Sequence, residues 1–185
     1  MVAGLLKEIK VKSKRLFKGR IISLRVDETL IGSRRMSREV VEHPGSVAVV
    51  PLLSESEVIL IKQYRYAVGR ELLEIPAGTL EKGEKPLECA KRELVEETGY
   101  RAHRLRRLGS VYLAPGYCDE LIHIYLAERL EFVGQKAEMD ERIKVVVLSL
   151  EKALQEVLTQ RFYDAKTMCG LFLAMKALAL KETNK

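Results

Sequence analysis

The sequence predicts a mixed α/β fold, of the α/β or α+β type, in which helices and strands form a sandwich. Extended apolar patterns dominate the first half of the 185 residues; one helical pattern, further strands and two final helical patterns follow. That order favours helices packed on a mixed sheet over an all-β or all-α domain. The length and the 47% apolar content are sufficient for one globular domain with a sizeable core.

Residues 1–43 are predicted to form an N-terminal antiparallel, strand-rich arm, separate from a main domain over residues 44–185. Residues 20–32 alternate between apolar and polar side chains, and the alternation stops at Gly32-Ser33, a turn signal. Residues 38–43 resume the extended pattern. Pro44-Gly45 then interrupts it, which places the domain boundary here.

Two strands rich in Val, Ile and Leu are predicted next, over residues 46–53 and 57–65. The short polar stretch between them suggests that they pair as a hairpin. Residues 71–86 contain two prolines and two glycines and are predicted to be a long connection. Long loops inside compact domains are often functional.

A helix is predicted from Pro86, which suits a first helical turn, to Gly99, which suits a helix C-terminus. Strands follow over residues 103–113, 121–130 and 143–150, and helices over 149–160 and 164–181. Five apolar residues of the last helix recur at helical spacing and are predicted to lie in the core: Met168, Leu171, Phe172, Met175 and Leu178.

The net charge of +6 suits phosphate-bearing ligands, but the aromatic content of 6% gives no sign of base-stacking nucleic-acid recognition. We therefore expect no nucleic-acid partner. Three widely spaced cysteines favour a reducing compartment over a disulfide framework or zinc site. The short apolar N-terminus is not typical of a signal peptide or membrane span, so we expect a cytoplasmic protein.

Three glutamates, Glu93, Glu96 and Glu97, share one side of the helix predicted over residues 86–98. Like charges three and four residues apart destabilise a helix unless a cation compensates them. A ligand set of carboxylate oxygens suits Mg²⁺ or Mn²⁺. The alternative interpretation is an ordinary solvated acidic face.

The context of the three glutamates is the stretch GTLEKGEKPLECAKRELVEETGY, residues 78–100. Its spacing from Gly78 through Glu84 and Arg92 to Gly99 resembles the Nudix box of the Nudix hydrolases. The resemblance implies a Nudix-type α/β/α sandwich. It also implies metal ligation by Glu93, Glu97, Glu96 and the Ala77 carbonyl, and an ion pair between Glu84 and Arg92 that holds the loop to the helix.

The resemblance extends to the ADP-ribose pyrophosphatase branch of that family. QYRYAVGRELLEIPAG, residues 63–78, resembles the approach to the box and makes Arg65 and Arg70 candidates for phosphate contacts. Pro115 follows Gly99 at the spacing typical of this branch, and Glu120 would line the same site.

The branch also implies a homodimer, formed through the N-terminal arm, and an arginine of the arm near the adenosine. Arg38 matches that arginine. The general base would come from a loop after the box; Glu141 matches its position best and Glu138 is the second choice. Glu97 is also assigned to the catalytic set.

Together these residues predict metal-dependent hydrolysis of ADP-ribose to AMP and ribose 5-phosphate. Three alternatives remain open: another nucleoside diphosphate sugar such as GDP-mannose, a non-catalytic nucleotide-binding sensor, and an RNA-processing Nudix enzyme. The first alternative changes only the substrate. The second is a protein that binds a nucleotide without hydrolysing it. The third is suggested only by the positive net charge.

Overall fold

The chain forms two compact units in the computed structural model, which describes residues 7–135, 143–159 and 164–182. The N-terminal unit comprises residues 1–45 and 112–120, and the main unit comprises 46–111 and 121–185. The sequence analysis predicted a boundary after residue 43 and did not assign residues 112–120 to the arm.

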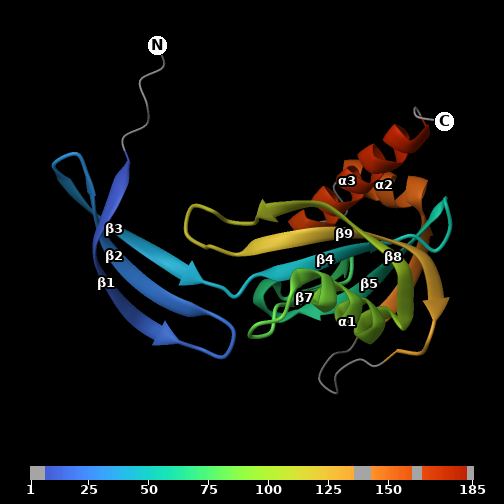
Figure 1. Cartoon of the computed structure of the whole chain (residues 1–185), viewed down its shortest axis with the longest axis horizontal. Coiled ribbons are helices and arrows are strands. Elements are labelled where there is room, and N and C mark those ends of the chain that lie inside the picture. The colour runs from blue at the N-terminus through green and yellow to red at the C-terminus, as the bar shows by residue number, and fades with distance from the viewer. Residues whose placement is uncertain (1–6, 136–142, 160–163, 183–185) are drawn as a thin grey trace, which may run out of the picture. The chain divides into compact units, whose positions relative to one another are not determined.

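The N-terminal unit is a three-stranded antiparallel sheet of β1 (Glu8–Lys18), β2 (Ser23–Ile31) and β3 (Arg34–Glu42), blue in Figure 1. Gly32, at φ 60°, adopts the left-handed conformation that the turn between β2 and β3 requires. Residues 112–120 join this sheet through β3: the Val41 N–H donates to the Tyr117 carbonyl at 2.8 Å, and the Asp119 N–H donates to the Val41 carbonyl at 3.2 Å.

The main unit contains two sheets and a mixed strand order. The four-stranded sheet has the order β7-β4-β9-β8 and the three-stranded sheet the order β10-β5-β6. β4 runs parallel to β9 and antiparallel to β7. The strands are β4 (Ser46–Pro51), β5 (Glu57–Arg65), β6 (Arg70–Glu74), β7 (Ala77–Thr79), β8 (Tyr100–Tyr112), β9 (Leu121–Phe132) and β10 (Ile143–Ser149), with a 3₁₀ turn over Tyr66–Val68. The predicted mixed α/β fold with a mixed sheet is confirmed.

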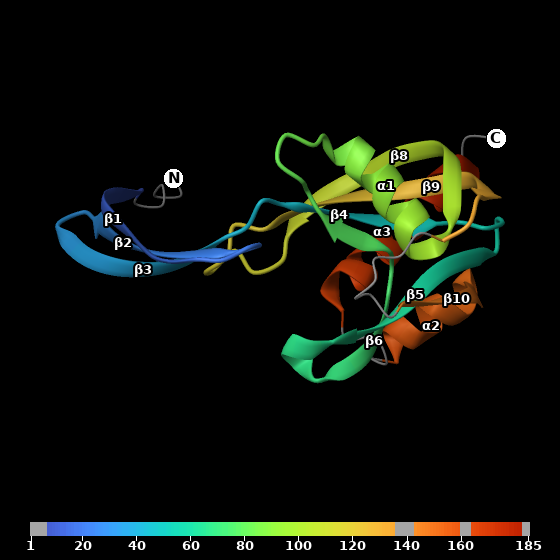
Figure 2. The ribbon, with the colours of Figure 1, turned by 90° about the horizontal axis from the view of Figure 1, so that it is seen from below.

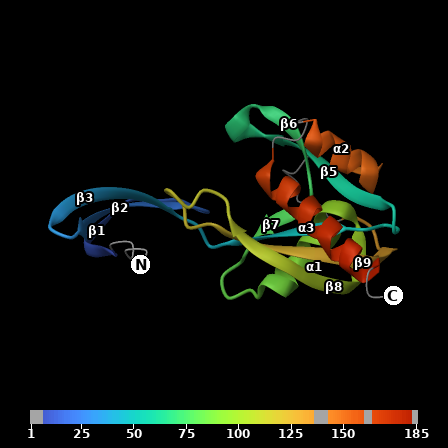
Figure 3. The same cartoon turned by 90° about the horizontal axis from the view of Figure 1, so that it is seen from above.

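Helices cover both faces of the four-stranded sheet, which explains why every residue of β4 is buried. α1 (Pro86–Thr98) packs against Val47 and Val49, and α3 (Ala165–Glu182) packs on the opposite face, against Ala48 and Val50. Figure 2 shows α1 in front of the sheet, and Figure 3, from the other side, shows α3 in front. α2 (Leu150–Leu158) lies beside β5 and β10.

Helix α1 has the ends that the sequence predicted. Pro86 stands in its first turn, and Gly99 follows its last residue in the left-handed conformation at φ 78°. The Gly99 N–H donates to the Val95 carbonyl at 2.9 Å and so satisfies one terminal carbonyl.

The predicted hairpin between residues 46–53 and 57–65 is wrong. β4 and β5 belong to different sheets, and only an isolated bridge between Leu52 and Val58 joins them. A fully apolar strand predicts burial on both faces but does not specify its neighbour. The predicted connection over residues 71–86 is also partly wrong, because most of β6 and all of β7 fall within it.

The predicted core face of α3 is correct only in part. Leu171 is fully buried, whereas Phe172 and Met175 are 40% and 41% exposed. Within the described ranges, no helix is both long and apolar enough to cross a membrane. Cys89, Cys118 and Cys169 are free thiols.

Candidate active site

The acidic residues of α1 lie against the short strand β7. Glu97 is 2% exposed, and one of its carboxylate oxygens accepts a hydrogen bond from the Ala77 N–H at 2.8 Å. Glu93 lies over Gly78, where an added Cβ would be 1.9 Å from the carboxyl carbon of Glu93. Glycine at this position therefore lets the Glu93 carboxylate lie directly against the strand, and a larger residue would displace the carboxylate.

Arg92 forms ion pairs with three carboxylates at once. Its Nε and Nη2 atoms form a fork with both Glu84 oxygens at 3.0 Å, which ties the loop before α1 to the helix. Its Nη1 atom donates to Glu93 at 2.7 Å and to Glu96 at 2.9 Å. The pair with Glu84 was expected from the sequence, whereas the contacts of Arg92 with Glu93 and Glu96 were not.

The electrostatics of this cluster follow from its geometry. The fork from Arg92, aided by further hydrogen bonds, lowers the pKa of Glu84 to about 2. Burial, with the negative charge of Glu84 nearby, raises the pKa of the Cys89 thiol to about 12, so Cys89 stays protonated and is no nucleophile at neutral pH. The single positive charge of Arg92 is thus shared among the three carboxylates that it pairs with.

The carboxylate oxygens of this cluster are suitable ligands for a hard divalent ion. Glu93, Glu96 and Glu97 provide oxygen ligands only, and Gly78 keeps the strand close beneath them. Within the described ranges, no three acidic, His or Cys side chains are already gathered in a metal-binding arrangement. Arg92 holds Glu93 and Glu96, so ion binding would require these two carboxylates to turn away from its guanidinium.

Arg65 and Arg70 occupy opposed positions on the β5–β6 hairpin. Arg65 donates from Nε and Nη2 to the two oxygens of Glu74 at 2.8 and 2.7 Å, and its side chain is 39% exposed. Arg70 is exposed at the start of β6. The charge of Glu97 also contributes to the raised pKa of Arg65, after the larger contribution of the Glu74 hydrogen bonds.

Arg38 and Pro115, which are 77 positions apart in the sequence, line one cavity of about 410 Å³ in the N-terminal unit. Arg38 Nε lies 2.8 Å from a Glu8 oxygen. Glu120 is 3.9 Å from the ring of His43 and is not among the residues that line this cavity. Glu138 and Glu141, the two candidates for the general base, lie outside the described residues.

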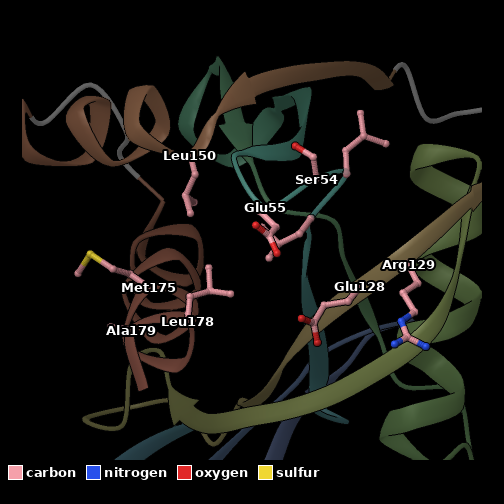
Figure 4. A pocket seen from close by; sticks show the side chains of 10 residues that line it. Ser54, Glu55, Glu128, Arg129, Leu150, Met175, Leu178 and Ala179 are labelled. Atoms are coloured by element: carbon pink, nitrogen blue, oxygen red, sulfur yellow. The ribbon is translucent and has the colours of Figure 1, made fainter. Parts of the chain in front are cut away.

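The main unit has a second cavity, of about 570 Å³, shown in Figure 4. The side chains of Leu150, Met175 and Leu178 line one side, and the carboxylates of Glu55 and Glu128 lie opposite. None of the predicted site residues lines this cavity.

The sequence analysis missed a buried polar cluster beside the candidate site. Glu74 is fully buried, and it contacts both Arg65 and Lys166 of α3. Thr167, also fully buried, accepts a hydrogen bond from the Ile75 N–H at 2.9 Å. The only local signal was a glutamate within the apolar run LLEIP, because its partner Lys166 is 92 residues away.

Comparison with known proteins places the chain among named relatives. The NUDIX domain model matches residues 42–169. An ADP-ribose pyrophosphatase of Bacillus subtilis is 42% identical over 96% of this chain and 95% of its own length. A methanol dehydrogenase activator of Bacillus methanolicus is 39% identical over 98% and 97%, and a GDP-mannose pyrophosphatase of Citrobacter koseri is 36% identical over 72% and 75%.

A crystal structure of an ADP compounds hydrolase shares the fold, with a TM-score of 0.85 over 97% of this chain and 98% of that chain at 23% identity. The matched domain, the relatives and the fold agree with the glycine-bounded acidic helix. The chain therefore belongs to the Nudix family and is a Nudix hydrolase.

Proposed function

We propose that this Nudix hydrolase cleaves the pyrophosphate bond of ADP-ribose and releases AMP and ribose 5-phosphate. The observation that supports the reaction is the group of Glu93, Glu96 and Glu97 on α1, with Glu93 over Gly78 and Glu97 bonded to the Ala77 N–H. The substrate is suggested by the ADP-ribose pyrophosphatase of B. subtilis, which matches 96% of the chain, whereas the GDP-mannose pyrophosphatase matches 72%.

Three glutamates and the Ala77 carbonyl would hold Mg²⁺ or Mn²⁺. When bound, the ion would neutralise charge on the pyrophosphate and make a water molecule more acidic. Glu97 is already oriented by the Ala77 N–H, and the Glu84–Arg92 fork keeps the loop attached to the helix. In this proposal, ion binding turns the side chains of Glu93 and Glu96 away from Arg92, while these two contacts hold the loop and the strand in place.

The remaining residues have proposed roles at the two ends of the substrate. Arg65 and Arg70 would bind phosphate oxygens, which suit the fork of a guanidinium. Arg38, Pro115 and Glu120 would contact the adenosine end. Glu141, or otherwise Glu138, would accept the proton of the attacking water.

The test is a hydrolysis assay with Mg²⁺ on ADP-ribose, GDP-mannose and capped RNA. We expect the highest kcat/KM for ADP-ribose; a higher value for GDP-mannose or capped RNA would reject the proposed substrate. Tight binding of nucleotide without turnover would instead favour a sensor. The metal role predicts that Glu97→Gln removes turnover but retains ligand binding, while Glu88→Gln, at an exposed position of the same helix, changes neither.

The choice of base is tested separately. Glu141→Gln should reduce kcat more than Glu138→Gln, with little change in metal affinity for either variant. The opposite order would assign the base to Glu138.

We also propose a homodimer formed through the N-terminal sheet. This unit exposes many apolar side chains, of which several are 40% exposed or more: Ile9, Val11, Leu16, Phe17, Ile21, Ile22 and Met36. Such a concentration is typical of a protein interface. Sedimentation should give about twice the chain mass of 21.0 kDa; a monomer at micromolar concentration would contradict the proposal.

The free thiols suit a cytoplasmic location.

A further inference from the structure

The buried cluster around Glu74 connects three separate elements of the main unit. Glu74 ends β6, Arg65 ends β5, and Lys166 lies in the first turn of α3. The side chain of Glu74 is 1% exposed and that of Lys166 is 10% exposed. Buried charges of this kind are costly unless they are paired and hydrogen-bonded, as these are.

Glu74 fixes one edge of the Arg65 guanidinium. The fork uses Nε and Nη2, and no hydrogen bond to a described residue uses Nη1. Among the described residues, Nη1 and the second Nη2 hydrogen of this outer edge have no acceptor, and the proposed function has them bind a substrate phosphate. A guanidinium held in this way loses less rotational freedom on binding a phosphate than a mobile one.

Lys166 stabilises the ionised form of Glu74. Burial opposes ionisation of this carboxyl group, but the contacts with Arg65 and Lys166 outweigh burial and hold its pKa below the usual value. Lys166 is positioned in turn by Asp164, 3.0 Å from its Nζ. Asp164 also accepts a hydrogen bond from the Thr167 N–H at 2.9 Å, which caps the start of α3.

The same turn of α3 also contacts the segment that leads into β7, the strand of Ala77, whose carbonyl is one of the proposed metal ligands. Thr167 accepts the Ile75 N–H, and two residues later the Ala77 N–H donates to Glu97. The start of α3 is thus linked to Arg65 through Glu74, and to the acidic helix through residues 75–77.

We infer that Lys166 is a positioning residue for catalysis: it pairs with Glu74, which grips one edge of the Arg65 guanidinium and so aligns Arg65 for a substrate phosphate. The inference rests on the proposed function. It differs from a general structural role because the effect of Lys166 should pass through Arg65.

The experiment is a double-mutant cycle in kcat/KM, measured with Mg²⁺ on the best nucleoside diphosphate sugar. Lys166→Met should lower kcat/KM by about tenfold. The loss should appear mainly as a higher KM, because a misaligned Arg65 would bind the substrate phosphate less well. In an Arg65→Met background the same change should cost less than about twofold. Lys166→Arg, which keeps the positive charge, should retain most of the original kcat/KM.

Two further variants control for folding and surface charge. Lys62→Met removes a half-exposed lysine that pairs with Glu71 on the same hairpin, and it should leave kcat/KM unchanged. Glu74→Gln combined with Lys166→Met removes the two most buried charges of the network together, so neither stays buried without the other. The kcat/KM of this double variant should fall as much as that of Lys166→Met. A cooperative thermal unfolding transition would confirm that the double variant is folded.

Equal losses from Lys166→Met with and without Arg65 would overturn the inference, as would a failure of Lys166→Arg to retain activity. Normal activity of the folded Glu74→Gln/Lys166→Met variant would overturn it as well. If the unaltered chain hydrolyses no nucleoside diphosphate sugar, the proposed function itself fails. If it does hydrolyse one and the cycle is additive, only the role of Lys166 fails.

Discussion

Replacing Glu84 with Gln should destabilise the protein in a pH-dependent manner. The pKa of Glu84 falls from the ordinary 4.5 to about 2, primarily because Arg92 donates two hydrogen bonds to it. At about 1.36 kcal/mol for each tenfold change in acidity, this fall corresponds to an upper limit of about 3.4 kcal/mol. The side chains of Glu84 and Arg92 are 15% and 28% exposed, and screening by solvent reduces the expected loss at pH 7 to about 1–2 kcal/mol.

The sign of the pH dependence follows from the lowered pKa. The ionised Glu84 stabilises the folded state above pH 4.5, and this stabilisation is lost as the pH falls towards 2. Relative to pH 7, the stabilisation should be clearly smaller at pH 4 and smaller again at pH 3. The difference between the original chain and Glu84→Gln should shrink in the same proportion.

Urea unfolding in EDTA, at pH 7, 5, 4 and 3, measures this difference without bound metal. Glu88→Gln is the matched control, because Glu88 pairs with Lys91 on the same helix but both side chains are at least half exposed. It should cost less than about 0.5 kcal/mol at any of these pH values. A difference for Glu84→Gln that is absent at pH 7, or that stays constant down to pH 3, would refute the reasoning.

Other positions give equally direct tests. In a steady-state assay, Gly78→Ala should lower kcat about a hundredfold, because the added Cβ would displace the Glu93 carboxylate. The control Gly109→Ala should have near-normal kcat, because its added Cβ would make only an ordinary contact at 3.6 Å. Leu171→Ala should cost about 2–5 kcal/mol in urea unfolding, and the 40%-exposed Phe172→Ala clearly less; equal losses would contradict the packing of α3. Chelation by EDTA should abolish hydrolysis and added Mg²⁺ should restore it; turnover that persists in EDTA would exclude the metal role.

The sequence predicted features that depend on local patterns. The ends of α1 follow from Pro86 and Gly99, whose backbone preferences act within one turn of the helix. The spacing of the acidic residues placed them on one helix face for the same reason, since residues three and four apart are neighbours there. The preference for a metal site over a solvated acidic face came from the resemblance to the Nudix box.

Features that depend on pairing over long distances were not predictable in this way. The apolar pattern of β4 and β5 is compatible both with a hairpin and with strands in separate sheets. The structure has separate sheets, with helices packed on both faces of β4. Lys166 and Glu74 carry no shared pattern in the sequence, because their contact arises only when α3 packs against the end of β6.

The joining of residues 112–120 to β3 has a consequence for the order in which the chain folds during synthesis. β1, β2 and β3 pair with their neighbours in sequence, so this sheet can begin to form as soon as it leaves the ribosome. The hydrogen bonds of Val41 to Tyr117 and Asp119, however, must wait until the chain has grown to these residues, 76 and 78 positions after Val41. The N-terminal unit is therefore completed only after most of the four-stranded sheet has been translated, and the growing chain carries an unfinished apolar sheet during that interval.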